Sequence, residues 1–467
     1  MKTFLPASSV SILFYCIVTI LLTSSCANII PPSGGAMDSL PPVLISAIPQ
    51  DSATNFSGNR ITLNFDEYVD LQNTFENVLV SPLPKNAPLI NNSFRTVTIK
   101  MKDTLEPNTT YSINFGNALR DINENNIAKN FTYVFSTGNT IDENTISGKV
   151  VMAESGKIDS TLIVVLHRSI EDSAVANERP RYFARLDGQG IFQFYNLPDG
   201  NFTLYAIPNN YSKQFDDSTK PFAFADSIIN TVNNKPLILY AYARAKKDST
   251  AKVNNANADK NSKDEMVLRM QVSLSGGKQD ILTKLKLGFN KKIQKFDTLK
   301  ILLTDTNYKR VNAYGVVADS NNNGLNIVLN WSPDTYYKLI VDSAAVNDSA
   351  GKGLAKTDTI SFSTKKMEDY GSVKLRFTNL DLSKNPVLLI IQNEVIVESV
   401  PLKQKDFYRK LFTPGDYDIR ILYDKNNNGI WDPGKFFGIH QQPEIVVPLS
   451  TKLSVRGNWD NEKDIIL

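Results

Sequence analysis

Residues 424–432 have the side-chain types and the spacing of a cation-binding loop. Their sequence, Asp-Lys-Asn-Asn-Asn-Gly-Ile-Trp-Asp, places oxygen-bearing side chains at the first, third, fifth and ninth positions. Alternate residues direct their oxygens inward, and the glycine at the sixth position permits the sharp turn that brings them together. Calcium is the ion that such a set of hard oxygen donors predicts. The candidate ligands are Asp424, Asn426, Asn428, the carbonyl of Ile430, and Asp432.

This spacing resembles the first part of an EF-hand loop. The twelfth position is Lys435, so the glutamate that completes such a loop with two oxygens is missing. The resemblance therefore implies weak binding, with a Kd of roughly 10⁻⁴–10⁻³ M. The alternative interpretation is a hairpin tip stabilised by Asx turns, with Trp431 packed at its base. Residues 319–324 and 121–125 are similar in composition and are predicted to be turns.

Cys26 follows a short apolar N-terminal segment and is one of only two cysteines in the chain. Lys2, the apolar residues 10–22 and the small residues 23–25 have the order of an export signal. The segment is too short to span a bilayer comfortably. A cysteine directly after small residues resembles the lipobox of bacterial lipoproteins, which implies acylation at Cys26 and cleavage before it. Ordinary signal cleavage and an uncleaved anchor are the alternatives.

The lipobox resemblance also implies a partner and a location. A chain carrying fatty acyl groups such as palmitate is held at a membrane by its N-terminus, and several acyl chains make that attachment stable. We therefore expect an outer-membrane lipoprotein, with the periplasmic and the surface face both open. Because Cys16 lies in the predicted leader, the mature chain has no second cysteine for a disulfide.

Groups for catalysis are few. His167 and His440 are the only histidines, and a Ser-His-Asp triad would have to use one of them. His167 follows the apolar run 162–166, which predicts a packed strand residue, and His440 lies in a predicted loop. A zinc site needs three or four nitrogen, sulfur or carboxylate ligands, and no pair of histidines has a suitable spacing. We therefore expect no enzyme activity and no cofactor beyond weakly bound calcium.

A further motif, Asp followed by Ser or Thr and then a small or aliphatic residue, recurs along the chain. It resembles the O-glycosylation sequence used on exported proteins of some bacteria. The alternative is that Asp-Ser and Asp-Thr pairs simply favour turns. The candidate hydroxyls are Ser52, Thr104, Ser173, Ser343 and Thr359.

The elements that position these residues are predicted to be strands. Apolar and polar residues alternate over 61–65, 111–115 and 373–377, the period of a strand with one face on a core. Asn, Asp and Gly clusters separate these segments at short intervals, as turns do. The fold class is therefore all-β. The charges nearly balance, with a net charge of +3, so no basic field argues for nucleic acid as a partner and none is expected.

The chain also repeats itself, which predicts two kinds of module in the order A-B-A′-B′. Residues 107–113 return as 333–339, and the motif Phe-Ser-Thr at 135–137 returns at 362–364. The other corresponding pairs are 61–65 with 285–289, 127–129 with 354–356, 162–166 with 387–391, and 197–204 with 412–419. The predicted division is 1–25 signal peptide, 26–39 flexible linker, 40–141 first module, 142–245 second module, 246–265 disordered hinge, 266–367 third module and 368–467 fourth module.

The first module resembles the bacterial Ig-like domain of the SbsA type. The residues that carry the resemblance are Leu40-Pro41-Pro42, Ile61-Thr62-Leu63-Asn64-Phe65-Asp66, Pro107-Asn108-Thr109-Thr110-Tyr111 and Phe135-Ser136-Thr137-Gly138. The third module departs from it, with Asn290 at the position of Asp66 and Lys365 after Ser-Thr. The second module resembles prealbumin-like or carboxypeptidase-regulatory-like domains through Leu197-Pro198-Asp199-Gly200-Asn201-Phe202. Both resemblances imply β-sandwiches used as spacers, adhesive units or binding accessories.

Together these patterns predict a non-enzymatic cell-envelope lipoprotein that serves as a structural or adhesive spacer, or binds an envelope protein or glycan. The alternative is a glycan-binding accessory lipoprotein of an outer-membrane uptake system. Two or three exposed aromatic side chains on one sandwich face would favour the alternative, because fold alone cannot decide between them.

Overall fold

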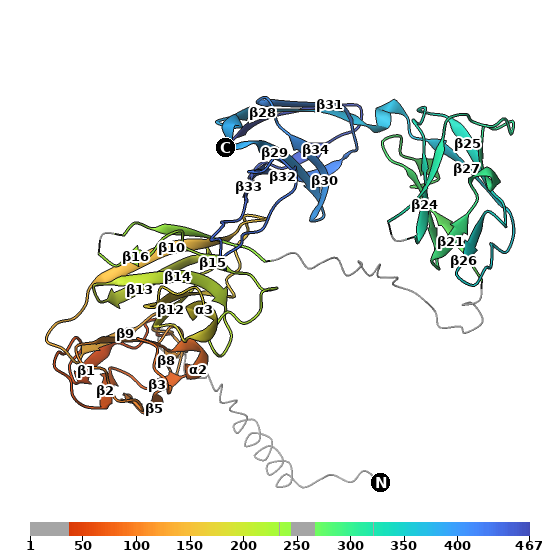
Figure 1. The fold of residues 1–467 in the computed structure, drawn as a ribbon. Helices are drawn as coiled ribbons and strands as arrows, with labels where there is room; N and C mark the ends of the chain where they lie inside the picture. The colour runs from red at the N-terminus through yellow and green to blue at the C-terminus, as the bar shows by residue number, and fades with distance from the viewer. Residues whose placement is uncertain (1–36, 233, 244–266, 321) are drawn as a thin grey trace, which may run out of the picture. The chain divides into compact units, whose positions relative to one another are not determined.

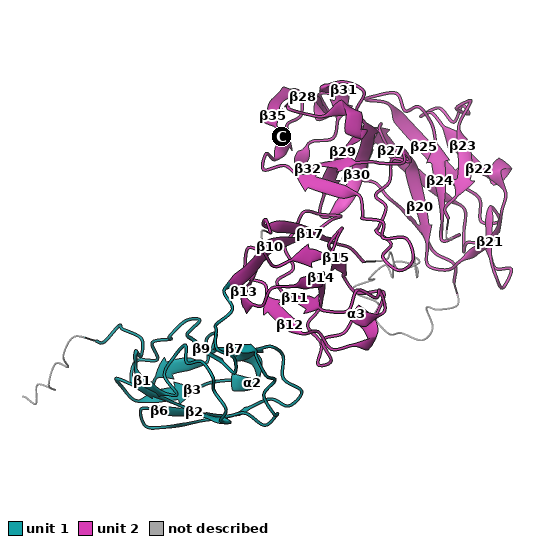
Figure 2. Cartoon of the chain, turned by 60° about the vertical axis from the view of Figure 1, so that its left-hand side comes forward, with its two compact units in different colours: residues 1–143 teal, residues 144–467 magenta. Residues whose placement is uncertain are grey.

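The computed structural model describes residues 37–232, 234–243, 267–320 and 322–467 (Figure 1). Cys26, the predicted leader and the predicted hinge at 246–265 lie outside the described residues. The chain divides into two compact units, Met1–Glu143 and Asn144–Leu467 (Figure 2). The first unit contains the first module, and the second contains the other three.

The predicted all-β class is confirmed. The described α-helices, α2 (Thr74–Asn77) and α3 (Ala174–Asn177), have four residues each. Three short 3₁₀ turns accompany them: η2 (Thr298–Lys300), η3 (Met367–Asp369) and η4 (Leu382–Lys384). Everything else that is regular in the described part of the chain is strand.

The first module consists of antiparallel sheets with the orders β1-β2-β6-β5, β4-β7-β9 and β3-β8. The predicted alternation is confirmed, because Ile61, Leu63 and Phe65 are at most 1% exposed while the residues between them are partly exposed. Its strands are β1 (Leu44–Ile48), β2 (Arg60–Phe65), β3 (Val69–Leu71), β4 (Leu79–Ser81), β5 (Leu89–Ser93), β6 (Thr96–Lys100), β7 (Thr110–Asn114), β8 (Leu119–Asp121) and β9 (Thr132–Ser136).

The third module has the corresponding sheets β18-β20-β24-β23, β19-β27-β25-β22 and β21-β26, and differs by the extra strand β19, which pairs in parallel with β27. Trp331 is 4% exposed and packs edge-on against Tyr337 and Phe362, so it belongs to the core of this module. The strands are β18 (Met270–Val272), β19 (Lys278–Gln279), β20 (Leu285–Phe289), β21 (Ile293–Phe296), β22 (Ile301–Thr304), β23 (Gly315–Ala318), β24 (Gly324–Val328), β25 (Tyr336–Val341), β26 (Val346–Asp348) and β27 (Asp358–Thr364).

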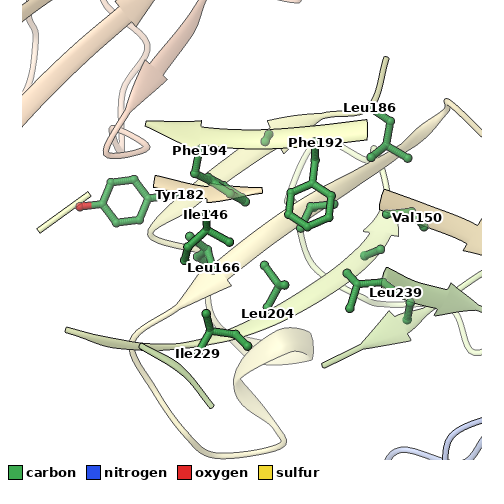
Figure 3. Close-up of a cluster of buried hydrophobic side chains, with 14 of the residues drawn as sticks. Ile146, Val150, Leu166, Tyr182, Leu186, Phe192, Phe194, Leu204, Ile229 and Leu239 are labelled. Carbon is green, nitrogen blue, oxygen red and sulfur yellow. The ribbon is translucent and has the colours of Figure 1, made fainter. Parts of the chain in front are cut away.

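The second module has the sheets β13-β10-β17 and β12-β11-β14-β15, and β16 also pairs with β14. Strands β10 and β17 run parallel. Phe192, Phe194, Leu204 and Leu239 converge on the core between the sheets (Figure 3). The strands are β10 (Asn144–Met152), β11 (Leu162–His167), β12 (Tyr182–Arg185), β13 (Ile191–Leu197), β14 (Asn201–Pro208), β15 (Ala223–Phe224), β16 (Ile229–Asn230) and β17 (Leu237–Ala241).

The fourth module repeats that arrangement in the sheets β31-β28-β35 and β30-β29-β32-β33, with β34 also paired to β32. Strand β30 is an edge strand on which Val395, Ile396 and Val397 are 62%, 54% and 48% exposed. The strands are β28 (Gly371–Thr378), β29 (Pro386–Gln392), β30 (Val395–Pro401), β31 (Asp406–Phe412), β32 (Gly415–Tyr423), β33 (Ile445–Pro448), β34 (Leu453–Val455) and β35 (Asp460–Ile466).

Candidate functional site

The predicted calcium loop follows β32, and the side chain of Asp424, the first residue of the loop, binds the loop's backbone. Oδ1 of Asp424 accepts the backbone N–H of Asn427 at 2.6 Å, and Oδ2 accepts that of Gly429 at 2.6 Å. Asp424 is only 2% exposed. A buried carboxylate needs hydrogen-bond donors to offset its lost hydration, and here the turn itself supplies them.

Three of the five candidate ligands meet at the far side of the loop. The amide nitrogens of Asn426 and Asn428 donate to Oδ2 of Asp432, at 2.6 and 2.7 Å. The amide oxygens of the two asparagines accept the backbone N–H groups of Asn428 and Ile430. These contacts are the Asx-type hydrogen bonds that the turn interpretation predicts. Over the described ranges, no group of three or more His, Cys, Asp or Glu is placed to hold a metal, and calcium stays a prediction.

A carboxylate outside the motif, Glu444, also holds this loop. Its Oε1 accepts the backbone N–H of Lys425 at 2.7 Å, and its Oε2 accepts that of Asp432 at 3.0 Å. Its carbonyl accepts the indole N–H of Trp431, which is the predicted packing of that ring at the base of the loop. Glu444 is 3% exposed. Sequence reasoning missed it because it reaches the loop only when β33 pairs with β32.

The two histidines lie in different surroundings. His167 ends β11, is 2% exposed and stands edge-on to Tyr205 at a ring distance of 5.9 Å. Burial lowers the pKa of His167 to about 4, so its ring is neutral at physiological pH. His440 lies in the predicted loop, and its Nε2 is 2.7 Å from Oδ1 of Asp172.

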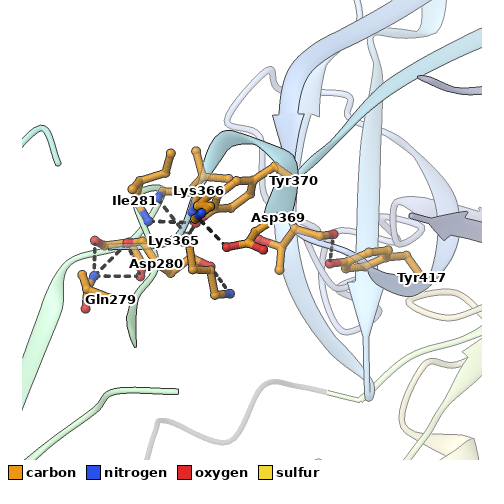
Figure 4. A network of polar contacts seen from close by, with 11 residues as sticks. Gln279, Asp280, Ile281, Lys365, Lys366, Asp369, Tyr370 and Tyr417 are labelled. Carbon is orange, nitrogen blue, oxygen red and sulfur yellow. Dashed lines mark hydrogen bonds and ion pairs between the residues drawn. The ribbon is translucent and has the colours of Figure 1, made fainter. Parts of the chain in front are cut away.

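A polar network joins the third module to the fourth (Figure 4). The hydroxyl of Tyr370 donates to Oδ1 of Asp280 at 2.8 Å and accepts the backbone N–H of Ile281 at 2.9 Å. The ammonium of Lys365 lies 3.1 Å from Oδ2 of the same aspartate. Burial, followed by the hydrogen bond to Asp280, raises the pKa of Tyr370 above its usual range. The network fixes the start of β28 against the loop after β19.

One pair of exposed aromatic side chains lies on the first module. Tyr68 and Phe94 are 48% and 75% exposed, and their ring centroids are 5.9 Å apart. The guanidinium of Arg95 lies 5.3 Å from the Tyr68 centroid. Partial burial and the charge of Asp121 raise the pKa of the adjacent Glu67. Aromatic faces beside polar groups are the kind of surface on which sugar rings stack.

The five candidate hydroxyls for glycosylation are placed as follows. Ser52, Thr104, Ser173 and Thr359 are exposed, and Ser343 is half-buried. Ser52 and Ser173 lie in turns, whereas Thr359 lies within β27.

The comparison with protein families finds one match. Residues 38–137 match the model of the bacterial Ig-like domain, so the chain contains an Ig-like domain at the position of the first module. A search of the curated proteins found no match. No described helix has the length and apolar character that crossing a membrane requires.

Solved structures align with the chain at low similarity. They include the Bacillus anthracis TIE protein at 12% identity, covering 93% of this chain and 76% of that one, with a TM-score of 0.17. The major pilin subunit BcpA of Bacillus cereus aligns at 11% identity over 70% of this chain and 99% of its own, with a TM-score of 0.17. The BSP domain of a biofilm-associated protein aligns at 11% identity over 85% and 97%, with a TM-score of 0.16.

Proposed function

We propose that this chain is a non-enzymatic lipoprotein of the cell envelope, in which tandem β-sandwiches serve as a structural or adhesive spacer or as an interaction surface. The network of Tyr370, Asp280 and Lys365 carries this proposal, because it converts a junction between two sandwiches into a fixed one. A spacer requires such fixed junctions to hold a surface at a set distance. The Ig-like match over residues 38–137 supports the same role.

The anchor in this proposal is Cys26, acylated at its sulfur and inserted in the outer membrane. Its test is cell fractionation of the Cys26→Ala variant, which we expect in the soluble fraction while the wild type sediments with membranes. Cys16→Ala is the matched control and should stay with the membranes, because Cys16 belongs to the predicted leader. Membrane retention of Cys26→Ala would refute acylation at that residue.

The adhesive role has its own test, cell attachment. Deleting the chain should lower attachment of cells to one another or to a surface, and wild-type protein should restore it. Cys26→Ala protein should not restore it, because a spacer released from the membrane transmits no force to the cell. Attachment that is unchanged by the deletion would contradict the adhesive role.

The second candidate function is a glycan-binding accessory of an outer-membrane uptake system. The exposed pair Tyr68 and Phe94 favours it, because sugar rings stack on such faces. The double variant Tyr68→Ala, Phe94→Ala should then lose binding to a glycan array. Tyr408→Ala is the control, because Tyr408 is also exposed, at 58%, but lies on β31 of the fourth module. Equal glycan binding by wild type and double variant would remove this candidate.

A further inference from the structure

A loop of the fourth module inserts an aromatic ring into the second module, more than two hundred residues away in the chain. Phe436 is 5% exposed. Its centroid lies 5.4 Å from that of Tyr205, 5.3 Å from Phe222 and 4.9 Å from Phe224. We call the cluster of mutually contacting rings Tyr205, Phe222, Phe224 and Tyr242 the aromatic socket. Edge-on and tilted rings at these distances are favourable beyond the apolar area that they bury.

The backbone of the fourth module also lies close to the second module. A Cβ added at Gly434 would lie 2.6 Å from the ring of Tyr242, so this part of the loop approaches the socket closely only because it is glycine. On the other side, a Cβ at Gly156 of the second module would overlap Pro448 of the fourth. The two modules therefore pack closely at both positions, where any side chain larger than that of glycine would clash with the other module.

Polar contacts surround the aromatic centre. The backbone N–H of Val446 donates to the carbonyl of Ala153 at 2.8 Å. The amide of Gln442 donates to the carbonyl of Phe224 at 3.0 Å. Two side-chain contacts to carboxylates complete the rim: Nε2 of His440 lies 2.7 Å from Asp172, and the ammonium of Lys157 lies 2.6 Å from Glu394. An apolar centre with a polar, more exposed rim is the anatomy of a specific protein interface.

The contact also bypasses a long stretch of chain. Between the socket, which ends at Tyr242, and Gly434 the chain runs through residues 244–266, the third module and most of the fourth. The interface joins the second and fourth modules directly. A pull applied across these two modules therefore acts on the interface before it acts on the bypassed chain.

We infer that this contact is a mechanical clasp. It carries tension between the second and fourth modules while it is closed, and it lengthens the molecule when it opens, before any module unfolds. The clasp is a property of the folded chain and does not depend on the lipid anchor or on the identity of any envelope partner.

Cutting the bypassed chain tests the clasp in the full-length protein. A protease site is placed among residues 250–260, and the cleaved protein is analysed by size-exclusion chromatography with mass detection. We expect the two fragments to co-elute at the mass of one chain. Separation of the wild-type fragments after cleavage would overturn the proposal. A mass of two chains before cleavage would also overturn it, because the contact would then join copies.

Two variants locate the contact. Phe436→Ala should release the fragments, with a dissociation constant raised at least tenfold. Tyr408→Ala is the matched control, since Tyr408 is a 58% exposed aromatic residue on β31 of the same module, and it should leave the fragments together. Lys157→Glu places like charges opposite Glu394 at a surface position, where misfolding is not a concern, and should weaken the association at low salt and less so at high salt. Fragments held equally by all variants would overturn the assignment.

Single-molecule stretching tests the release of length. Handles are attached at exposed positions of the second and fourth modules in the uncut chain. The wild type should show one lengthening step at a force below those of module unfolding, and Phe436→Ala should lack that step. A wild-type trace that begins directly with module unfolding would refute the clasp.

Discussion

The phenolic oxygen of Tyr370 lies 2.8 Å from Oδ1 of Asp280, across the junction between the third and fourth modules. The register that matches Phe362 with Phe135 places Glu143 and Gly138 at the positions of Tyr370 and Lys365. Neither residue can form this network. The boundary between the two compact units falls after Glu143, whereas the corresponding position in the second half lies within one unit. The two halves therefore share module folds but have different residues at these two positions.

Replacing Tyr370 by phenylalanine tests how much the network contributes. The Tyr370→Phe variant removes one donated and one accepted hydrogen bond and keeps the ring. We expect the free energy of unfolding of the third and fourth modules to fall by about 1–3 kcal/mol, since Ile281 N–H and Asp280 each lose a partner. Denaturant unfolding of the full chain measures this change. Tyr336→Phe is the control, because Tyr336 is 66% exposed, and equal stability of both variants would contradict the prediction.

The buried imidazole of His167 predicts a pH dependence of stability. Its pKa is about 4 in the folded state and close to 6.5 in the unfolded chain, so the unfolded state binds more protons between these values. Stability is then full above pH 6.5 and falls as the pH drops towards 4, by about 3 kcal/mol in total. Urea unfolding at a series of pH values measures this slope.

Substitution tests whether His167 causes this pH dependence of stability. His167→Leu should remove this part of the pH dependence, and His440→Leu should leave it, because the His440 side chain is 54% exposed. A His167→Leu variant with the full wild-type slope would show that another group is responsible.

Two threonines make the same contacts in the first and third modules. Oγ1 of Thr137 donates to the carbonyl of Glu106 at 2.6 Å and accepts the N–H of Thr109 at 3.0 Å. Oγ1 of Thr364 does the same with Ser332, at 2.6 Å, and Thr335, at 2.9 Å. Thr137→Val and Thr364→Val should each cost about 1–3 kcal/mol in the module that contains them. Thr359→Val, at an exposed position of β27, should change stability little. Thermal unfolding measures the stability of all three variants. A loss of stability in only one of the two modules would show that the repeated contacts do not stabilise both modules alike.

The calcium prediction is tested by melting. Millimolar calcium should raise the Tm of the fourth module in the wild type, because binding to the folded state alone stabilises it. Asp432→Asn should abolish that rise, since it removes the charge on which Asn426 and Asn428 converge. Magnesium at equal concentration is the control ion, because it is reluctant to give up its waters. A wild-type Tm that is the same in calcium and in chelator would rule out calcium binding and favour the interpretation as a hydrogen-bonded turn.

Much of the fold was predictable because its signals are local. The alternation of Ile61, Leu63 and Phe65 fixes one face of β2, and Trp331 follows two alternating apolar residues into the core. The contacts that join modules were not predictable. Asp280 and Tyr370 are ninety positions apart, and Phe436 meets Phe222 only once two separate sandwiches have formed. No pattern in the sequence indicates that the two residues of either pair lie in contact.

The edge strand β30 has a consequence for how the protein behaves in concentrated solution. A strand from another molecule can pair with this edge, because residues 395–397 are apolar and exposed and β30 has a partner strand on one side only. Glu394 and Glu398 flank this segment and are engaged by Lys157 and Arg409. We expect these two carboxylates to oppose such pairing, so replacing them by neutral residues should make the chain self-associate although the sandwich beneath stays folded.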